Sequence, residues 1–446
     1  MPEEHPTLLD ILDASEGGAI GGLPAGGSPQ PPADCEIEVG EDGELHLPEA
    51  ALRRWGVTPG TRLRLRQTPE GLMLQRADPV LARVYVEPTN SCPLSCRTCV
   101  RSVWHEPEGR MEMATYGRLI DGLRDVPSLR QISFWGIGEP LLHPGLVEMV
   151  SLAKALGVRT ELITSALLLN EKKAAGLVEA GLDSLVISVD GTSEEAQADV
   201  RPGAALRRVR ENVGRLLAIR DASGRSTPEI GLAFVAMRRN IGELAGLRRL
   251  ADSLKATAVT VTNVLPYTEE MKGEILYGVG VHGLPATGRH ERWAEIVLPG
   301  MDVRPQVLEP LLKLLGSLSL PSPGQARRGG AHGYCQFVGE GSVAVSWDGE
   351  VSPCIALMHS YPCYVLGRRK EIRRYNLGNA GREAIEDIWQ RDEFVRFRDR
   401  VQRFDFSPCT ACGGCTLAES NEEDCYGNPF PVCGDCLWAQ GVIQCP

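Results

Sequence analysis

The distribution of fourteen cysteines constrains what this chain can fold into more than any other feature of its sequence. Cys92, Cys96 and Cys99 lie within the short stretch NSCPLSCRTCV, and no further cysteine follows until Cys335. Ten cysteines, of which Cys335 is the first, fall in the last part of the chain. Cysteines that served only as small core residues would be spread along the chain, so this clustering indicates metal binding.

Length and composition limit the classes of protein to which this chain can belong. A chain of 446 residues is too long for one hydrophobic core, so two or three domains are expected. Its 43% hydrophobic and 24% charged residues are typical of soluble proteins, and no apolar run reaches the roughly 18 residues of a membrane span. The acidic N-terminus lacks a secretory signal, which predicts the cytoplasm, where thiols stay reduced. A net charge of −11 argues against nucleic acid as a partner of the whole chain.

The N-terminal part divides into a tail and a small module. Residues 1–34 form a predicted flexible tail, since residues 15–34 are rich in Gly, Pro and Ala. Residues 35–78 alternate apolar and polar positions between Gly-containing turns, which indicates a small β module. This module resembles the AbrB-type swapped-hairpin fold, and the resemblance implies a homodimer through residues 35–78. The matching positions are Gly43, Leu47, Pro48, Gly56, Pro59, Gly60 and Leu63.

The middle of the chain predicts an α/β fold. Six β-branched, apolar runs (RVYVEP, QISFWG, VRTELITS, DSLVISVD, EIGLAFVAM and TAVTVTNVL) alternate with helical segments. This alternation is typical of a parallel sheet, here a partial (β/α)6 TIM-type barrel over residues 80–265, with its active site at the C-terminal ends of the strands. Residues 266–330 are interpreted as a connector with little regular structure. Residues 331–446 are expected to form a cysteine-rich domain stabilised by metal rather than by a hydrophobic core.

The three-cysteine loop directly follows the first predicted strand, so it is expected at the mouth of the barrel. Three cysteine ligands would leave one iron of a four-iron cluster open, because such clusters have four ligand positions. The alternative is a zinc knuckle completed by His105.

The spacing C-x3-C-x2-C at this place resembles the signature of radical S-adenosylmethionine (SAM) enzymes. The resemblance implies that Cys92, Cys96 and Cys99 hold a [4Fe-4S] cluster whose fourth iron is chelated by the amino and carboxylate groups of SAM. It also implies reductive cleavage of SAM to a 5′-deoxyadenosyl radical, with an electron donor such as ferredoxin or flavodoxin.

Further positions resemble the SAM-binding motifs of that family. The stretch FWGIGEPLLHP resembles the Gly-Gly-Glu-Pro motif that receives the SAM amino group, and Arg201 resembles an arginine that binds the SAM carboxylate. Each of these residues could equally be a helix cap or a surface residue. Thr98 stands where an aromatic residue is usual, with Trp104 as a substitute. The full set of implied contacts is Gly136, Gly138, Glu139, Pro140, Thr164 or Ser165, Ser188, Asp190 and Arg201.

The C-terminal cysteines resemble those of the SPASM domain, which holds auxiliary [4Fe-4S] clusters. The resemblance rests on the spacing Cys335-x13-Gly349-x4-Cys354 and on the following CTACGGC run. It implies two auxiliary clusters, which need about eight thiolates. Zinc is the alternative, since C-x2-C pairs suit it as well. The candidate ligands are Cys335, Cys354, Cys409, Cys412, Cys415, Cys425, Cys433, Cys436 and Cys445, with Cys363 as a tenth.

Several strings, among them VEPTNSCPLSCRTCVRSVWHEPEGRM and CGDCLWAQGVIQCP, resemble the radical SAM maturases associated with tungsten-cofactor oxidoreductases of the aldehyde ferredoxin oxidoreductase type. The resemblance implies maturation of such an enzyme or modification of its cofactor. A second hypothesis is a SPASM peptide maturase that forms thioether or carbon-carbon crosslinks in a ribosomal peptide. A third is a redox-sensing DNA-binding regulator, in which arginines of residues 53–66 give the AbrB-like module a basic face. The residues identify neither the substrate nor the atom from which hydrogen is taken.

Overall fold

The structure is a computed structural model, and it describes residues 38–39, 44–46, 48, 63–68, 71–76, 79–278, 287–290, 293–299, 301–302, 304–315, 333–412 and 415–444. The chain divides into two compact units, Met1–Thr61 and Arg62–Pro446. In the described part of the first unit, β1 (Glu38–Val39) pairs antiparallel with β2 (Leu45–His46). The predicted tail over residues 1–34 lies outside the described residues. The AbrB-like module lies largely outside them, so it stays a prediction.

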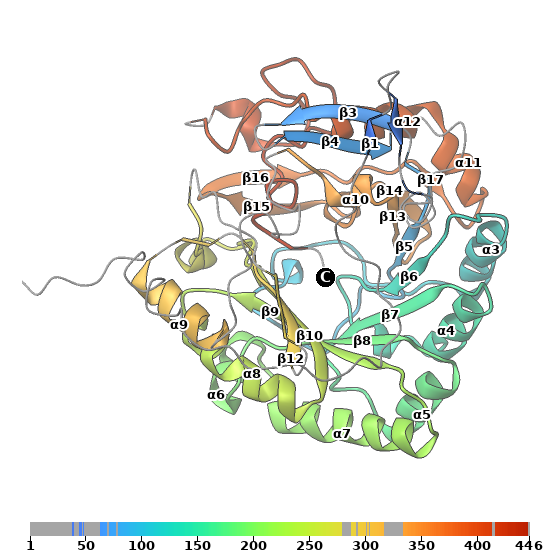
Figure 1. The fold of residues 1–446 in the computed structure, drawn as a ribbon, viewed down its shortest axis with the longest axis vertical. Coiled ribbons are helices and arrows are strands. Elements are labelled where there is room, and N and C mark those ends of the chain that lie inside the picture. Colours follow the sequence, from blue (N-terminus) through green and yellow to red (C-terminus); the bar gives the residue numbers. More distant parts are fainter. Residues whose placement is uncertain are drawn as a thin grey trace, which may run out of the picture. The chain divides into compact units, whose positions relative to one another are not determined.

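The second unit contains a parallel sheet that forms a partial barrel (Figure 1). Six consecutive strands lie side by side in chain order, each parallel to the next, as the sequence predicts. Most residues of these strands are buried, because helices cover the outer face of the sheet. They are β5 (Arg83–Val86), β6 (Gln131–Phe134), β7 (Arg159–Thr164), β8 (Ser184–Ser188), β9 (Glu229–Ala236) and β10 (Ala256–Asn263).

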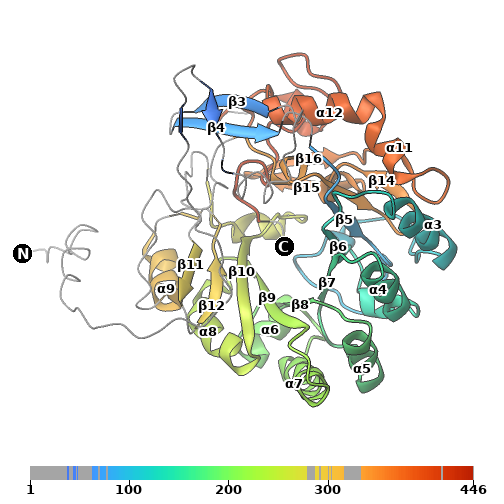
Figure 2. The ribbon, with the colours of Figure 1, turned by 45° about the vertical axis from the view of Figure 1, so that its right-hand side comes forward.

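Helices form the outer layer around these strands (Figure 2). The longest, α7, buries Leu206, Val209, Val213 and Leu216, which recur every three or four residues and so lie on one helix face. Asn170 caps α5 by accepting a hydrogen bond from the Lys173 amide. The helices are α3 (Met113–Leu123), α4 (Leu146–Lys154), α5 (Glu171–Glu179), α6 (Glu194–Val200), α7 (Leu206–Ala222) and α8 (Leu244–Ser253).

The predicted connector has more regular structure than expected. β12 (Trp293–Val297) extends the sheet by pairing parallel with β10, and β11 (Thr287–His290) pairs antiparallel with β12. The helix α9 (Pro305–Leu315) follows. The Pro and Gly content suggested a loop, but apolar residues repeat with helical spacing from Val307 to Leu314, and the helix tolerates Pro310 in its interior.

The C-terminal region continues the barrel sheet at its other edge. β13 (Ser342–Val345) pairs parallel with β5, followed by β14 (Glu350–Ser352) and β17 (Gly378–Asn379). The other elements are η6 (Ile355–Leu357), the hairpin β15 (Tyr361–Val365) and β16 (Arg368–Ile372), and the helices α10 (Gln336–Gly339), α11 (Ile385–Gln390) and α12 (Asp392–Arg403).

This region also has apolar packing, which corrects the expectation that metal alone stabilises it. Ile388 and Trp389 of α11 and Phe394 and Val401 of α12 are buried in the same hydrophobic cluster as the barrel strands. We predicted a separate C-terminal domain because cysteines dominate that part of the sequence. The barrel and the C-terminal region nevertheless share one sheet and one hydrophobic core. Among the described residues, no helix is both long enough and apolar enough to cross a membrane.

Candidate active site

One cavity collects most of the predicted site residues at the C-terminal ends of the barrel strands. Its volume is about 300 Å³, which suits a small-molecule site. Cys92, Cys96 and Cys99 line it together. Of the predicted SAM contacts, the cavity wall contains Gly136, Gly138, Glu139, Thr164, Ser165, Ser188 and Arg201, whereas Pro140 and Asp190 lie outside it. The fold therefore brings the cysteine loop, Arg201 and the C-terminal ends of β6, β7 and β8 to one place.

The cysteine loop is fastened by backbone and arginine contacts. Arg101 donates from Nη1 to the carbonyl oxygens of Cys92 and Leu94, at 3.0 and 3.4 Å. The Cys99 amide donates to the Cys96 carbonyl at 3.1 Å. Burial raises the pKa of all three thiols, that of Cys96 to about 11, and Arg201 acts in the opposite direction on Cys96. Bound iron would have to stabilise the thiolates, as coordinated metal does.

The donor set fits a multi-iron cluster better than a single zinc ion. His105, the proposed zinc ligand, is exposed and is absent from the cavity wall. Throughout the described part of the chain, no three His, Cys, Asp or Glu side chains converge closely enough to hold one metal ion. A four-iron cluster is larger than an ion, so its cysteine ligands lie farther apart than the ligands of one zinc ion.

The GIGEP stretch is held against the start of the cysteine loop by close backbone contacts. A Cβ at Gly138 would lie 2.3 Å from the Thr89 carbonyl oxygen and 2.5 Å from that of Ser91. A Cβ at Gly136 would lie 2.4 Å from Cγ of Glu87, so both positions need glycine. The Ile137 amide donates to Glu87 Oε1 at 2.8 Å.

Glu139 connects this stretch to the end of β7. Its carboxylate accepts hydrogen bonds from Thr164 Oγ1 at 2.5 Å, from Ser165 Oγ at 2.5 Å and from the Ser165 amide at 2.9 Å. It also accepts from the Leu141 amide at 3.1 Å and so caps the short helix η3 (Pro140–Leu142). Three predicted site residues therefore form one buried network, in which Glu139 positions the loop.

Arg201 lines the cavity and pairs with Asp190 behind it. Its Nε donates to Asp190 Oδ2 at 2.7 Å, and Asp190 Oδ1 accepts from the Val235 amide at 2.8 Å. Burial alone would lower the pKa of Arg201, but Asp190 and Cys96 raise it, so the guanidinium stays charged. Within the described chain, no residue accepts a hydrogen bond from its terminal nitrogens. Asp190 is fully buried, so it orients Arg201 rather than lining the cavity.

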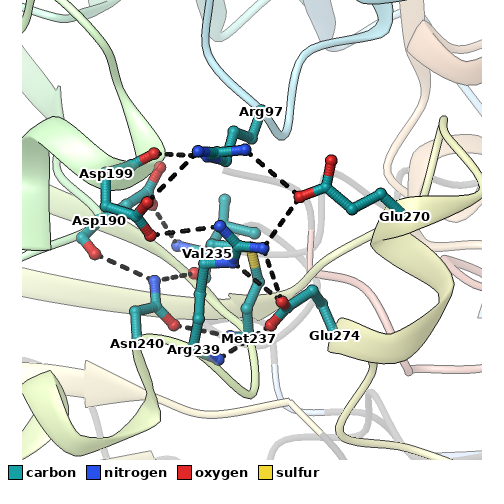
Figure 3. A network of polar contacts seen from close by, with 9 residues as sticks. All are labelled: Arg97, Asp190, Asp199, Val235, Met237, Arg239, Asn240, Glu270 and Glu274. Carbon is teal, nitrogen blue, oxygen red and sulfur yellow. Dashed lines mark hydrogen bonds and ion pairs between the residues drawn. The ribbon is translucent and has the colours of Figure 1, made fainter.

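A network of ion pairs outside the cavity holds the cysteine loop, and sequence reasoning missed it (Figure 3). Arg97, which lies inside the cysteine motif, donates from Nε to the Asp199 carbonyl at 2.7 Å and contacts Glu270 at 3.3 Å. Arg239 bridges Asp199, Glu270 and Glu274 at 2.8–3.3 Å. The network ties the loop to α6 and to η5 (Glu270–Glu274).

A buried histidine was also missed. His359, 2% exposed, contacts Glu106 Oε2 through Nδ1 at 2.8 Å and Glu87 Oε2 through Nε2 at 2.9 Å. Burial alone would lower its pKa, but the hydrogen bonds to Glu106 and Glu87 raise it to about 9. Trp104 lies against this ring, with centroids 4.6 Å apart, and is absent from the cavity wall. Trp104 is therefore not placed to contact an adenine in the cavity.

The C-terminal cysteines separate into two sets. Cys335, Cys354, Cys433 and Cys436 line a second cavity, and burial raises the pKa of each. Lys370 and Asp435 form a buried ion pair of 2.9 Å in its wall, which also contains the buried Cys363. The second set is more exposed and consists of Cys409, Cys412, Cys415 and Cys425. Cys445 lies outside the described residues.

The comparisons with known proteins agree with this arrangement. Residues 86–221 match the model of the radical SAM superfamily, and residues 335–416 match the SPASM iron-sulfur cluster-binding domain. Neither model extends to residues 35–78.

Among curated proteins, the chain is 29% identical to the tungsten-containing aldehyde ferredoxin oxidoreductase cofactor-modifying protein of Pyrococcus furiosus, over 81% of this chain and 96% of that protein. It is 33% identical to the PqqA peptide cyclase of Gluconobacter oxydans, over 41% of this chain and 49% of that protein.

Among solved structures, Streptococcus suis SuiB bound to precursor peptide SuiA has a similar fold, with a TM-score of 0.52, 16% identity and coverage of 84% of this chain and 74% of that one. The C-x3-C-x2-C loop, the barrel and both family models lead to the same conclusion. The chain carries a radical SAM domain over residues 86–221 and a SPASM domain over residues 335–416, and is an iron-sulfur enzyme that uses a [4Fe-4S] cluster with SAM and auxiliary clusters.

Proposed function

We propose that this enzyme matures a tungsten-containing oxidoreductase by modifying its cofactor. The observation that carries the proposal is the extent of the similarity to the Pyrococcus furiosus cofactor-modifying protein, which covers 96% of that protein. Similarity to the PqqA peptide cyclase covers only 49% of the cyclase. The second match, of 184 residues, is no longer than the barrel, whereas the first, of 371 residues, extends well beyond it.

The residues of the first cavity have distinct roles in this proposal. Cys92, Cys96 and Cys99 would hold the cluster, which would supply the electron for reductive cleavage of bound SAM. Arg201 binds the SAM carboxylate through its terminal nitrogens, because a guanidinium matches a carboxylate in charge and shape. Glu139 holds the Gly136–Gly138 backbone where the SAM amino group binds. The mostly apolar wall keeps water from the reacting group.

The two C-terminal cysteine sets are assigned to two auxiliary clusters. Cys335, Cys354, Cys433 and Cys436 line one cavity and are assigned as the four ligands of the first. The run Cys409, Cys412 and Cys415, with Cys425, supplies the second. Electrons reach these clusters from a low-potential carrier such as ferredoxin or flavodoxin. Cys445 and a homodimer through residues 35–78 stay predictions.

The test combines metal analysis with enzyme maturation. Anaerobic protein should contain about twelve irons, falling to about eight in a Cys92→Ala/Cys96→Ala/Cys99→Ala variant that no longer forms 5′-deoxyadenosine. A His105→Ala control should keep the full iron content. If His105 instead completes a zinc site, this variant should lose its bound metal. A tungsten aldehyde oxidoreductase co-produced with the wild-type enzyme should be active, and with the triple variant inactive.

Other results would select the other hypotheses. Oxidoreductase activity that does not depend on this enzyme would refute the proposal, and a crosslink formed in a short precursor peptide would support the peptide maturase instead. Salt-dependent DNA binding by residues 35–78 would be needed for the regulator hypothesis.

A further inference from the structure

The wall of the active-site cavity has two sources. The barrel and its loops carry the residues assigned above to the cluster and to SAM. The remaining wall comes from the C-terminal region, namely from Ile355, Ala356, Tyr361, Trp438, Ile443 and Gln444. None of these six residues was a predicted site residue, although Trp438, Ile443 and Gln444 belong to the stretch CGDCLWAQGVIQCP. These three also lie beyond the matched SPASM range.

The end of the chain is fastened to the barrel through its backbone. The Gln444 amide donates to Thr262 Oγ1 at 2.9 Å, and Asn263 Nδ2 donates to the Val442 carbonyl at 2.8 Å. Thr262 and Asn263 end β10, so the segment is held at the open end of the barrel. Because backbone groups make these bonds, the side chains of Ile443 and Gln444 are left to line the cavity.

The C-terminal wall is uncharged. Glu139 and Arg201 are the charged carboxylate and guanidinium groups among the described lining residues, and both lie on the barrel side. The Glu139 oxygens are already occupied by hydrogen bonds, and Arg201 is assigned to SAM. A phosphate or carboxylate at the C-terminal wall would therefore lose hydration without gaining a cation, which is costly.

Two neutral polar groups in this wall are available to a ligand. Within the described chain, no residue is hydrogen-bonded to the side-chain amide of Gln444 or to the indole N–H of Trp438. Tyr361 and Trp438 add flat aromatic surface, with the Tyr361 hydroxyl already donating to the Ala356 carbonyl at 2.9 Å. Aromatic faces bind flat rings, and an amide pairs with another amide-like edge.

We propose that the C-terminal wall binds an uncharged, flat heterocycle with an amide-like edge, such as the ring of a pterin. The side-chain amide of Gln444 forms hydrogen bonds with this edge, and anionic parts of the substrate stay outside the cavity. The inference rests on the proposed function and names the part of the cofactor that enters the cavity. A backbone amide with an aromatic side chain offers similar chemistry, so a peptide probe is included in the test.

The test measures binding to the reconstituted, SAM-bound full-length enzyme by fluorescence titration with two pterins. Neutral 6-hydroxymethylpterin should bind at least about tenfold more tightly than anionic pterin-6-carboxylate, because only the second carries an unpaired charge into the cavity. Gln444→Glu keeps the size and backbone contacts but replaces a donor by a charge, so it should weaken the neutral pterin by about tenfold or more. Gln390→Glu, at an exposed position outside the cavity, is the matched control and should change nothing.

Equal affinity for the two pterins, an unchanged affinity in Gln444→Glu, or tighter binding of N-acetyltryptophanamide than of either pterin would overturn the inference. Circular dichroism of both variants establishes that they are folded. Because binding is measured without turnover, a failure here together with normal maturation of the oxidoreductase refutes the cavity assignment alone. Oxidoreductase activity that does not depend on the wild-type enzyme refutes the proposed function itself.

Discussion

Replacing Gly138 by alanine tests whether the close packing of the GIGEP loop positions SAM. The added Cβ would lie 2.3, 2.5 and 2.6 Å from backbone atoms of Thr89, Ser91 and Asn90, respectively. Ordinary contacts between such atoms are about 3.5 Å, so one of the two backbones must move by about 1 Å. Backbone cannot rotate away as a flexible side chain can. The displaced segment is the one proposed to receive the SAM amino group and to precede the cysteine loop.

The expected effect is large on chemistry and small on folding. A misplacement of about 1 Å costs about a hundredfold in rate when reacting groups must be aligned, so single-turnover formation of 5′-deoxyadenosine should fall by that order. SAM affinity, measured by equilibrium dialysis, should fall with it. Gly117→Ala is the matched control, because Gly117 lies inside α3 with nothing within 4 Å of its Cβ position. It should stabilise the protein by about 0.5–1 kcal/mol and leave the rate unchanged.

A Gly138→Ala enzyme that forms 5′-deoxyadenosine within about threefold of the wild-type rate would refute the argument, since a misalignment of this size should reduce the rate far more. So would an equal loss in Gly117→Ala, which would show that the rate responds to any glycine substitution. Iron content of each variant distinguishes a displaced SAM site from a lost cluster.

Three further predictions concern charged groups around the clusters. The partners of His359 raise its pKa to about 9, above the unfolded value of 6.5, so the protonated histidine stabilises the fold fully below pH 6.5 and this contribution is lost as pH rises through 9. The free energy of unfolding in urea should therefore decrease over this pH range in the wild type and not in His359→Gln. Arg97→Ala should speed iron release to a chelator several-fold while costing less than about 1 kcal/mol, because its ion pairs are partly exposed; Arg118→Ala, outside this network, should not. Lys370→Met leaves Asp435 buried and unpaired, so it should lower the free energy of unfolding by about 3–5 kcal/mol. It should also lower the reduction potential of the auxiliary clusters, measured by a spin-resonance redox titration. The double variant Lys370→Met/Asp435→Leu should recover most of the stability.

Local patterns in the sequence were sufficient to predict the radical SAM resemblance and the order of the barrel strands. The spacing of Cys92, Cys96 and Cys99 and the alternation of apolar runs with helical segments are local patterns, and six predicted strands agree with β5–β10. Local patterns also have limits. Because residues 266–330 are rich in Gly and Pro, we did not predict β11, β12 and α9. Because the C-terminal part is rich in cysteines, we did not predict that apolar residues of α11 and α12 would join the core.

Which distant residues share a site became apparent only from the fold. Cys335 and Cys354 meet Cys433 and Cys436, His359 reaches Glu87, and Gln444 lies at the end of β10. These pairs are separated by dozens to hundreds of residues, and no periodicity records them. They meet because the C-terminal ends of parallel strands converge at one end of the barrel, and because β13 extends the same sheet and carries the C-terminal region to that end.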